Sequence, residues 1–131
     1  MESNGPLSGL TVVELGHSVA APFGGQTLAI LGARVIKVEN PINGDDARSW
    51  GPPFWEGASA CFQSLNREKL SITVDFKDAE QLEDLKRLID EYVGMGKFKI
   101  LKKIGQYRGK IYLKTMNKIL QDREGIICQA V

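Results

Sequence analysis

The sequence predicts an α/β fold, a Rossmann-like parallel sheet of three to four strands with flanking helices that forms a partial domain. Thr11–Leu15 and Ala33–Val38 are short runs rich in β-branched residues, and a helix-compatible stretch lies between them. Two strands joined by a helical crossover run parallel, and such crossovers are almost always right-handed. A third strand signal at Ser71–Asp75, followed by an amphipathic helix pattern, repeats the arrangement.

The first crossover has clear boundaries. Gly16 ends the first strand, Pro22 stands where a first helical turn accepts a residue without an N–H, and Gly32 ends the helix. Open parallel sheets bind ligands at the carboxyl ends of their strands, so the turn 16–21 is the first candidate site. Its small residues let the backbone approach a ligand, and a helix N-terminus favours an anionic group such as phosphate. The spaced-glycine dinucleotide fingerprint is absent, and small residues that merely pack helix on strand are the alternative.

Residues 40–46 form a turn-forming cluster that ends the second strand. Within it, Asp45 and Asp46 are expected to cap a turn in a solvated loop rather than to carry acid–base chemistry. The next segment, 48–55, contains two prolines and three aromatic residues. These aromatics are expected to be packing anchors, with direct ligand contact as the alternative.

The second helix is predicted over Ala79–Tyr92, because its leucines recur on one helical face. Asp78 and Gln81 have the spacing of a capping box at its start. Beyond it, Lys97–Lys102 is predicted as a fourth strand, 110–121 as a basic helix or strand–helix, and 125–131 as a short terminal strand. We therefore divide the chain into a Rossmann portion, 1–93, and a divergent basic segment, 94–131.

Charge differs between these two parts. Residues 1–93 hold 8 Lys and Arg against 14 Asp and Glu, whereas residues 94–131 hold 9 against 2. Such asymmetry can mark a tail that binds nucleic acid or a membrane. Apolar residues interleave with the basic ones in 94–131, which favours a packed element, so nucleic acid is not the expected partner.

Composition limits the remaining classes. The chain has 131 residues, enough for about one domain, and shows neither an apolar run of membrane-spanning length nor a basic secretory start. Cys61 and Cys128 lack metal or redox spacing and are expected to be reduced thiols, a disulfide being the alternative. A cytoplasmic location is expected, with mitochondria or peroxisomes open for a eukaryotic source.

Few side chains offer chemistry on their own. His17 is the only histidine and is expected to be a hydrogen-bonded structural residue, with catalysis as the alternative and no partner residues for a metal. Ser18 lacks the Gly-x-Ser-x-Gly context of a nucleophile. Arg67 and Lys69, before the third strand, can either grip phosphates or form an exposed charged turn.

Separate blocks carry a family resemblance: 6–15, 21–23, the Leu-Gly-Ala-Arg-Val-Ile-Lys-Val-Glu run at 31–39, 44–54, 64–69 and 71–75. In order and spacing they resemble the start of the class III CoA-transferases, which include carnitine/bile-acid-inducible CoA-transferase, formyl-CoA transferase and α-methylacyl-CoA racemase relatives. The resemblance covers about residues 6–89, so a truncated member of the family is expected.

The resemblance implies a function. Family members bind the CoA of an acyl thioester on a Rossmann-like domain, form interlocked homodimers, and move CoA between carboxylic acids without a metal. An aspartate attacks the donor thioester to give a mixed anhydride, the freed CoA thiolate makes an aspartyl thioester, and the acceptor carboxylate takes the CoA. The residues implied to touch CoA or acyl-CoA are His17, Ser18, Val19, Ala20, Asn40, Leu65, Asn66, Arg67 and Lys69. Asn40 departs from the family, in which many members have a phosphate-binding arginine.

No residue of this chain matches the family's aspartate nucleophile, which lies on a later segment. The catalytic residue is therefore unassigned, and the isolated chain is expected to show no turnover. Two further hypotheses stay open: a non-catalytic module that binds CoA or another adenine nucleotide, and an interaction protein whose basic segment contacts nucleic acid, an acidic protein or its own acidic front half.

Overall fold

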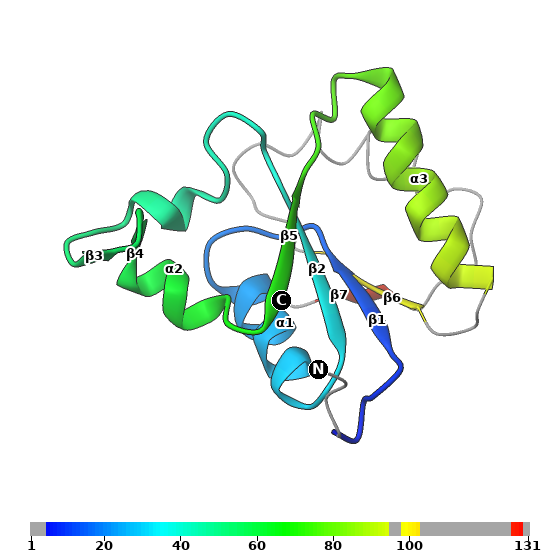
Figure 1. Ribbon diagram of the computed structural model, residues 1–131, viewed down its shortest axis with the longest axis horizontal. Helices are drawn as coiled ribbons and strands as arrows, with labels where there is room; N and C mark the ends of the chain where they lie inside the picture. Colours follow the sequence, from blue (N-terminus) through cyan, green and yellow to red (C-terminus); the bar gives the residue numbers. More distant parts are fainter. Residues whose placement is uncertain (1–4, 95–97, 103–126, 130–131) are drawn as a thin grey trace.

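A parallel sheet organises the protein, as the sequence predicts. The computed structural model describes residues 5–94, 98–102 and 127–129. Five strands of the described residues form the sheet in the order β5-β2-β1-β6-β7, with every neighbouring pair parallel. Their bounds are β1 Thr11–Glu14, β2 Arg34–Glu39, β5 Lys69–Thr73, β6 Phe98–Lys102 and β7 Ile127–Gln129. Figure 1 shows the strands side by side, with β5 at one end of the sheet.

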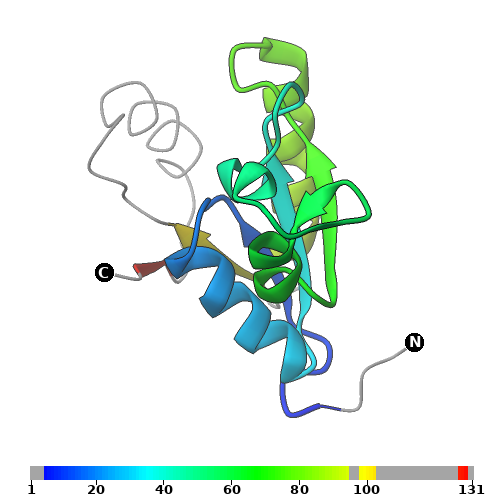
Figure 2. The same ribbon diagram turned by 90° about the vertical axis from the view of Figure 1, so that its left-hand side faces the viewer.

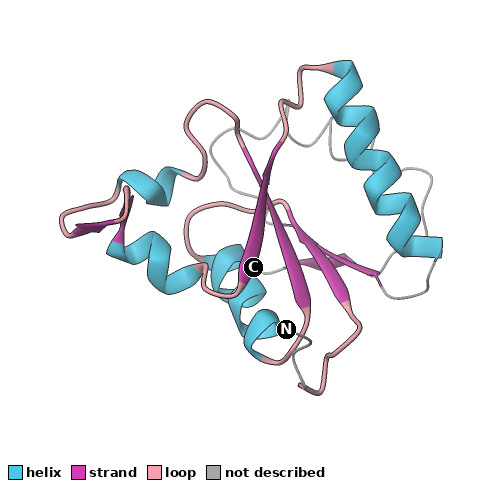
Figure 3. Ribbon diagram, in the orientation of Figure 1, coloured by secondary structure: helices cyan, strands magenta, loops and turns pink. Residues whose placement is uncertain are grey.

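Helices cover both faces of this sheet. Helix α1, Ala20–Ile30, packs on the face that carries Val12 and Val35. Helix α3, Ala79–Gly94, packs its leucines on the opposite face, which carries Val13 and Val38. Because successive strand residues point to opposite faces, one short strand serves both cores. The result is the three-layer arrangement in Figure 3.

The ends of the helices follow the expected rules. Helix α1 stops at Ile30, and Gly32 adopts a φ of +102°, a left-handed conformation that suits glycine. At the start of α3, Asp78 Oδ1 accepts the backbone N–H groups of Glu80 and Gln81, so the predicted N-cap is confirmed. The side chain of Gln81 accepts the backbone N–H of Asp75, rather than that of Asp78 as a capping box would require.

An arm leaves the sheet between β2 and β5. It contains a 3₁₀ helix η1, Asp46–Ser49, a two-stranded antiparallel ribbon of β3, Phe54–Trp55, and β4, Ala58–Ser59, and then α2, Ala60–Leu65. Figures 1 and 2 show the arm next to α1 and on the side of the sheet away from α3. Its own small core consists of Ala47, Ala58 and Phe62.

Three aromatic side chains of this arm are largely exposed. Trp50, Phe54 and Trp55 are 47, 58 and 70% exposed. The expectation of packing anchors is therefore wrong within the described chain, because the core of the arm is formed by Ala47, Ala58 and Phe62 and the three rings lie outside it.

The remaining predicted strands are present, with different bounds. The third strand begins at Lys69 and ends at Thr73, two residues before the predicted range, since Val35 of β2 pairs with Lys69. The predicted strands at 97–102 and 125–131 correspond to β6 and β7, which extend the same sheet beyond β1. The predicted basic helix or strand–helix at 110–121 lies outside the described residues.

Candidate functional site

Several charged side chains are buried on the sheet face that α1 and the arm cover. Glu14 of β1 and Lys37 of β2 are register partners, and both are almost completely buried, as is Glu39 two residues further on. A buried charge is costly unless it is paired and hydrogen-bonded. The contacts of these three side chains therefore decide how the site is built.

Lys37 is the centre of a buried ionic network. Its Nζ lies 2.9 Å from Glu14 Oε1 and 2.8 Å from Asp45 Oδ2. It also donates a hydrogen bond of 3.0 Å to the carbonyl oxygen of Gly16, which lies in the turn after β1. One ammonium thus joins two strands, the loop after β2 and the turn after β1.

Lys69 completes the network from the other side. Its Nζ lies 2.8 Å from Glu14 Oε2 and donates to the Pro22 carbonyl and to Asn66 Oδ1, both at 2.8 Å. Burial lowers the pKa of Lys69, and the Glu14 carboxylate opposes part of that decrease. The side chain is 2% exposed and its ammonium points into the protein, so the alternative of an exposed charged turn is wrong for Lys69.

Asp45 connects the network to the turn after β1. Its Oδ1 accepts the backbone N–H of Ser18 at 3.0 Å and that of Ala47 at 2.9 Å, so it caps η1 as predicted. It is only 1% exposed, and the expected solvated loop is wrong here because Lys37 draws the carboxylate inward. Burial acts to raise the pKa of Asp45, but the Lys37 ammonium and the two amides outweigh it and lower that pKa.

Glu39 forms a second charged cluster beside the first. Its carboxylate accepts two hydrogen bonds from Arg48, at 2.7 and 2.8 Å, one from Ser71 at 2.6 Å, and one from the Asp45 backbone at 2.8 Å. The guanidinium of Arg48 also stacks over the ring of Phe62, 3.9 Å from its centroid. Burial raises the pKa of Glu39, but the hydrogen bonds, led by Arg48, prevail and lower it from 4.5 to about 2.

This cluster makes the stability of the folded protein depend on pH in the acidic range. Since the pKa of Glu39 is lower in the folded state, its contribution is present above about pH 4.5 and is lost as the pH falls through about 2. We expect Glu39→Gln to flatten the fall of the urea midpoint between pH 4.5 and 2. Arg48→Met removes the hydrogen bonds that do most to lower the pKa of Glu39. In that variant the fall of the urea midpoint should therefore occur at higher pH. Identical pH profiles for wild type and both variants would contradict this assignment.

The turn after β1 leads directly into α1 and is partly exposed. Val19, the N-cap of α1, contributes no side-chain hydrogen bond, and the first turn of α1 contains no acidic residue. Val19 is 46% exposed, and Ser18 adopts a φ of +70°, unusual for a residue other than glycine. His17 is half-buried, and the structure records no hydrogen bond from its ring to a described residue, so its structural role stays a prediction. An uncapped helix N-terminus of this kind favours an anion.

The loop that begins β5 lies against α1. Gln26 of α1 donates to the Ser64 carbonyl at 2.6 Å and accepts the Arg67 backbone N–H at 2.9 Å. The side-chain amide of Asn66 donates a hydrogen bond to the Phe62 carbonyl and accepts one from Lys69, so both of its ends have partners within the protein. The side chain of Arg67, in contrast, is exposed. Of the candidates in this loop, Arg67 is therefore the one that presents its charge to solvent.

Asn40 lies apart from these contacts, directly after β2 at the same carboxyl edge of the sheet as the β1 turn. It is exposed, and its Oδ1 accepts the backbone N–H of Ile42 at 2.8 Å in a local turn. The structure thus places Lys69 against Pro22 in the first turn of α1 and Asn40 at the end of the strand next to β1.

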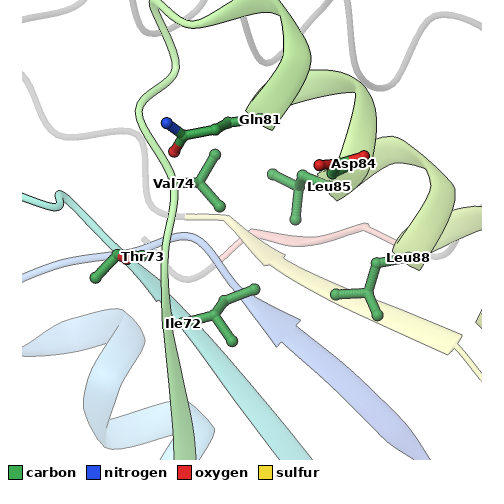
Figure 4. Close-up of a pocket in the computed structure, with 7 residues that line it drawn as sticks. All are labelled: Ile72, Thr73, Val74, Gln81, Asp84, Leu85 and Leu88. Carbon is green, nitrogen blue, oxygen red and sulfur yellow. The ribbon is translucent and has the colours of Figure 1, made fainter.

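A groove of about 300 Å³ lies elsewhere, between β5 and α3. Figure 4 shows Leu85 and Leu88 of α3 directed toward Ile72 and Val74, with Gln81 and Asp84 at its rim. None of the candidate residues lines it. Among the described residues, no cluster of three potential metal ligands occurs.

Comparison with known proteins identifies the family. Residues 7–92 match the family described as CoA-transferase family III. The chain belongs to CoA-transferase family III. It is 49% identical over 90 residues to the succinate–glutarate CoA-transferase of Agrobacterium fabrum, an alignment covering 64% of this chain and 22% of that protein. It is 47% identical over 87 residues to the succinyl-CoA:glutarate CoA-transferase of Mus musculus, covering 66 and 20%. The chain thus spans about a fifth of the length of these family III relatives.

Solved crystal structures share the fold. The crystal structure of a CAIB/BAIF family protein from Brucella suis superposes with a TM-score of 0.75 at 39% identity, covering 97% of this chain and 33% of that one. The Rv3272 protein of Mycobacterium tuberculosis gives a TM-score of 0.73 at 30% identity, covering 95 and 33%. No helix in the described part of this family III chain is both long and apolar enough to cross a bilayer.

Proposed function

We propose that this chain provides the CoA-binding portion of a family III CoA-transferase, and that the turn from His17 to Ala20 receives a phosphate-bearing part of CoA or acyl-CoA. The observation that carries the proposal is the uncapped, acid-free N-terminus of α1 at the carboxyl edge of the sheet, within a segment that matches the family. The other contacts proposed are Asn40 and the loop residues Leu65, Asn66 and Arg67, of which exposed Arg67 supplies the cation. The ammonium of Lys69 is buried and bound within the protein, so we do not include it.

In the complete protein we propose that CoA passes between carboxylic acids through an aspartyl group on a later segment than the one that matches the family. Relatives named for succinate and glutarate make small dicarboxylic acids the first donors and acceptors to test. Asp45 does not suit the nucleophile's role, because its carboxylate is buried against Lys37 and accepts two amide hydrogen bonds. Its neighbours stabilise the anion and hide it from a thioester.

Calorimetry with CoA tests the binding part. We expect the 131-residue chain to bind CoA, and Ala20→Asp to weaken binding at least tenfold, because it places a negative charge at the N-terminus of α1. Thr27→Asp is the matched control, since it adds the same charge on the exposed face of the same helix, away from the turn. Absent binding by the wild-type chain, or equal losses in both variants, would refute the proposal.

A turnover assay tests whether this chain only binds CoA or also transfers it. With succinyl-CoA and glutarate, the purified chain is expected to form no glutaryl-CoA. Transfer above the uncatalysed rate would show that a carboxylate of this chain acts as nucleophile, and would reject a role limited to CoA binding.

A further inference from the structure

The turn after β1 is clamped at two points by one buried ion pair. The Gly16 carbonyl accepts a hydrogen bond of 3.0 Å from Lys37 Nζ, and the Ser18 backbone N–H donates one of 3.0 Å to Asp45 Oδ1. Lys37 and Asp45 are themselves 2.8 Å apart, and each is 1% exposed or less at its side chain. The backbone groups on either side of His17 are therefore tied to a single rigid unit.

We propose that Asp45 is a positioning residue that sets the conformation of this turn and so aims the start of α1 at CoA. The inference rests on the proposed function for its ligand, while its structural part stands on the geometry alone. Asp45 lies 27 residues from Ser18 in the sequence and reaches it from the loop after β2. It does not touch the face offered to CoA, since its carboxylate is buried beneath the turn.

The conformation of Ser18 explains why the turn needs such a clamp. At a φ of +70° the residue occupies the left-handed region, which costs free energy for any side chain other than glycine's. Without the acceptor at Asp45, Ser18 can relax toward negative φ, and the following residues Val19 and Ala20 turn with it. A site held in its binding conformation before the ligand arrives binds more tightly, because less ordering is required on binding.

The buried surroundings make the clamp firm. Asp45 is also held by the Ala47 N–H, and its own N–H donates to Glu39 Oε2 at 2.8 Å. Lys37 is anchored by Glu14 on β1, the strand that leads into the turn. The carboxylate therefore cannot follow Ser18 if the turn moves.

The test compares Asp45→Ala with Asp45→Asn, which keeps an oxygen acceptor for Ser18. Leu85→Ala is the control, because it destabilises the core on the opposite sheet face without contact to the turn. All variants are measured at a temperature at which each is folded. We expect CoA affinity to fall about tenfold in Asp45→Ala, to stay within about threefold in Asp45→Asn, and to be unchanged in Leu85→Ala.

Amide hydrogen exchange by NMR gives a second, ligand-free measurement. In the wild-type chain the Ser18 amide should be protected, and Asp45→Ala should remove that protection while amides in β1 keep theirs. Should Asp45→Ala fail to fold, an unprotected Ser18 amide in the wild type already overturns the proposal. If the wild type binds no CoA, the proposed function fails, and positioning is judged on the exchange alone. Equal CoA affinities in Asp45→Ala and Leu85→Ala, with wild-type binding intact, also overturn it.

Discussion

Replacing Lys37 by methionine is expected to destabilise the protein by about 3–5 kcal/mol, the range found when one partner of a buried ion pair is removed. The change deletes the ammonium that contacts both Glu14 and Asp45. Glu14 keeps Lys69, but Asp45 keeps only its two amide donors and becomes a buried charge with no counter-ion in direct contact. Urea unfolding followed by circular dichroism measures the loss.

Lys86→Met is the matched control for this prediction. Lys86 pairs with Glu83 at 3.0 Å on the surface of α3, so its removal should cost less than about 1 kcal/mol. Adding Asp45→Asn to Lys37→Met should recover part of the stability, because it removes the unpaired charge. Equal unfolding midpoints for Lys37→Met and Lys86→Met would mean that the network contributes little.

Gly25→Ala and Gly24→Ala are expected to change stability in opposite directions. Alanine is normally the better helix residue by about 1 kcal/mol, and at Gly24 its Cβ meets nothing within 4 Å, so that variant should gain stability. At Gly25 the Cβ would overlap with Glu14 Oε2 and lie 3.0 Å from the Cδ of the same side chain. The carboxylate must move away from Lys69, which we expect to cost about 3 kcal/mol.

Thermal unfolding of the two alanine variants, compared with the wild type, checks the pair. Gly25→Ala should lower the midpoint and Gly24→Ala should raise it. A Gly25→Ala protein as stable as Gly24→Ala would show that the Glu14 carboxylate has a second position of equal free energy, and the buried network would then not be rigid.

The layers of the fold were predictable because hydrophobic spacing reports them directly. The runs Thr11–Leu15 and Ala33–Val38, with a helix between them, give parallel strands, and the leucine period of 79–92 gives α3. The exposure of Trp50 and Trp55 was not predictable from composition, since an aromatic ring is as compatible with a core as with a surface. Which of the two occurs depends on how much core the arm can build.

The ionic network escaped prediction for a related reason. Glu14 and Lys37 interrupt apolar strands, and a charged residue in such a strand is a visible signal, but its partner is set by strand register. Lys69 and Asp45 reach the same place from positions 24 residues apart along the chain, a contact that no local pattern encodes. The candidate turn itself was found, because the rule that ligands gather at strand carboxyl ends needs only the order of elements.

Among the described strands, β5 pairs on one side only, with β2. Its outer border consists of backbone donors and acceptors beside Leu70, which is 49% exposed. A strand with such a border is a template on which another strand can add. The sheet can therefore grow past β5 while β1, β2 and the charges between them stay in place, so oligomer formation through this border would leave the turn after β1 unaltered.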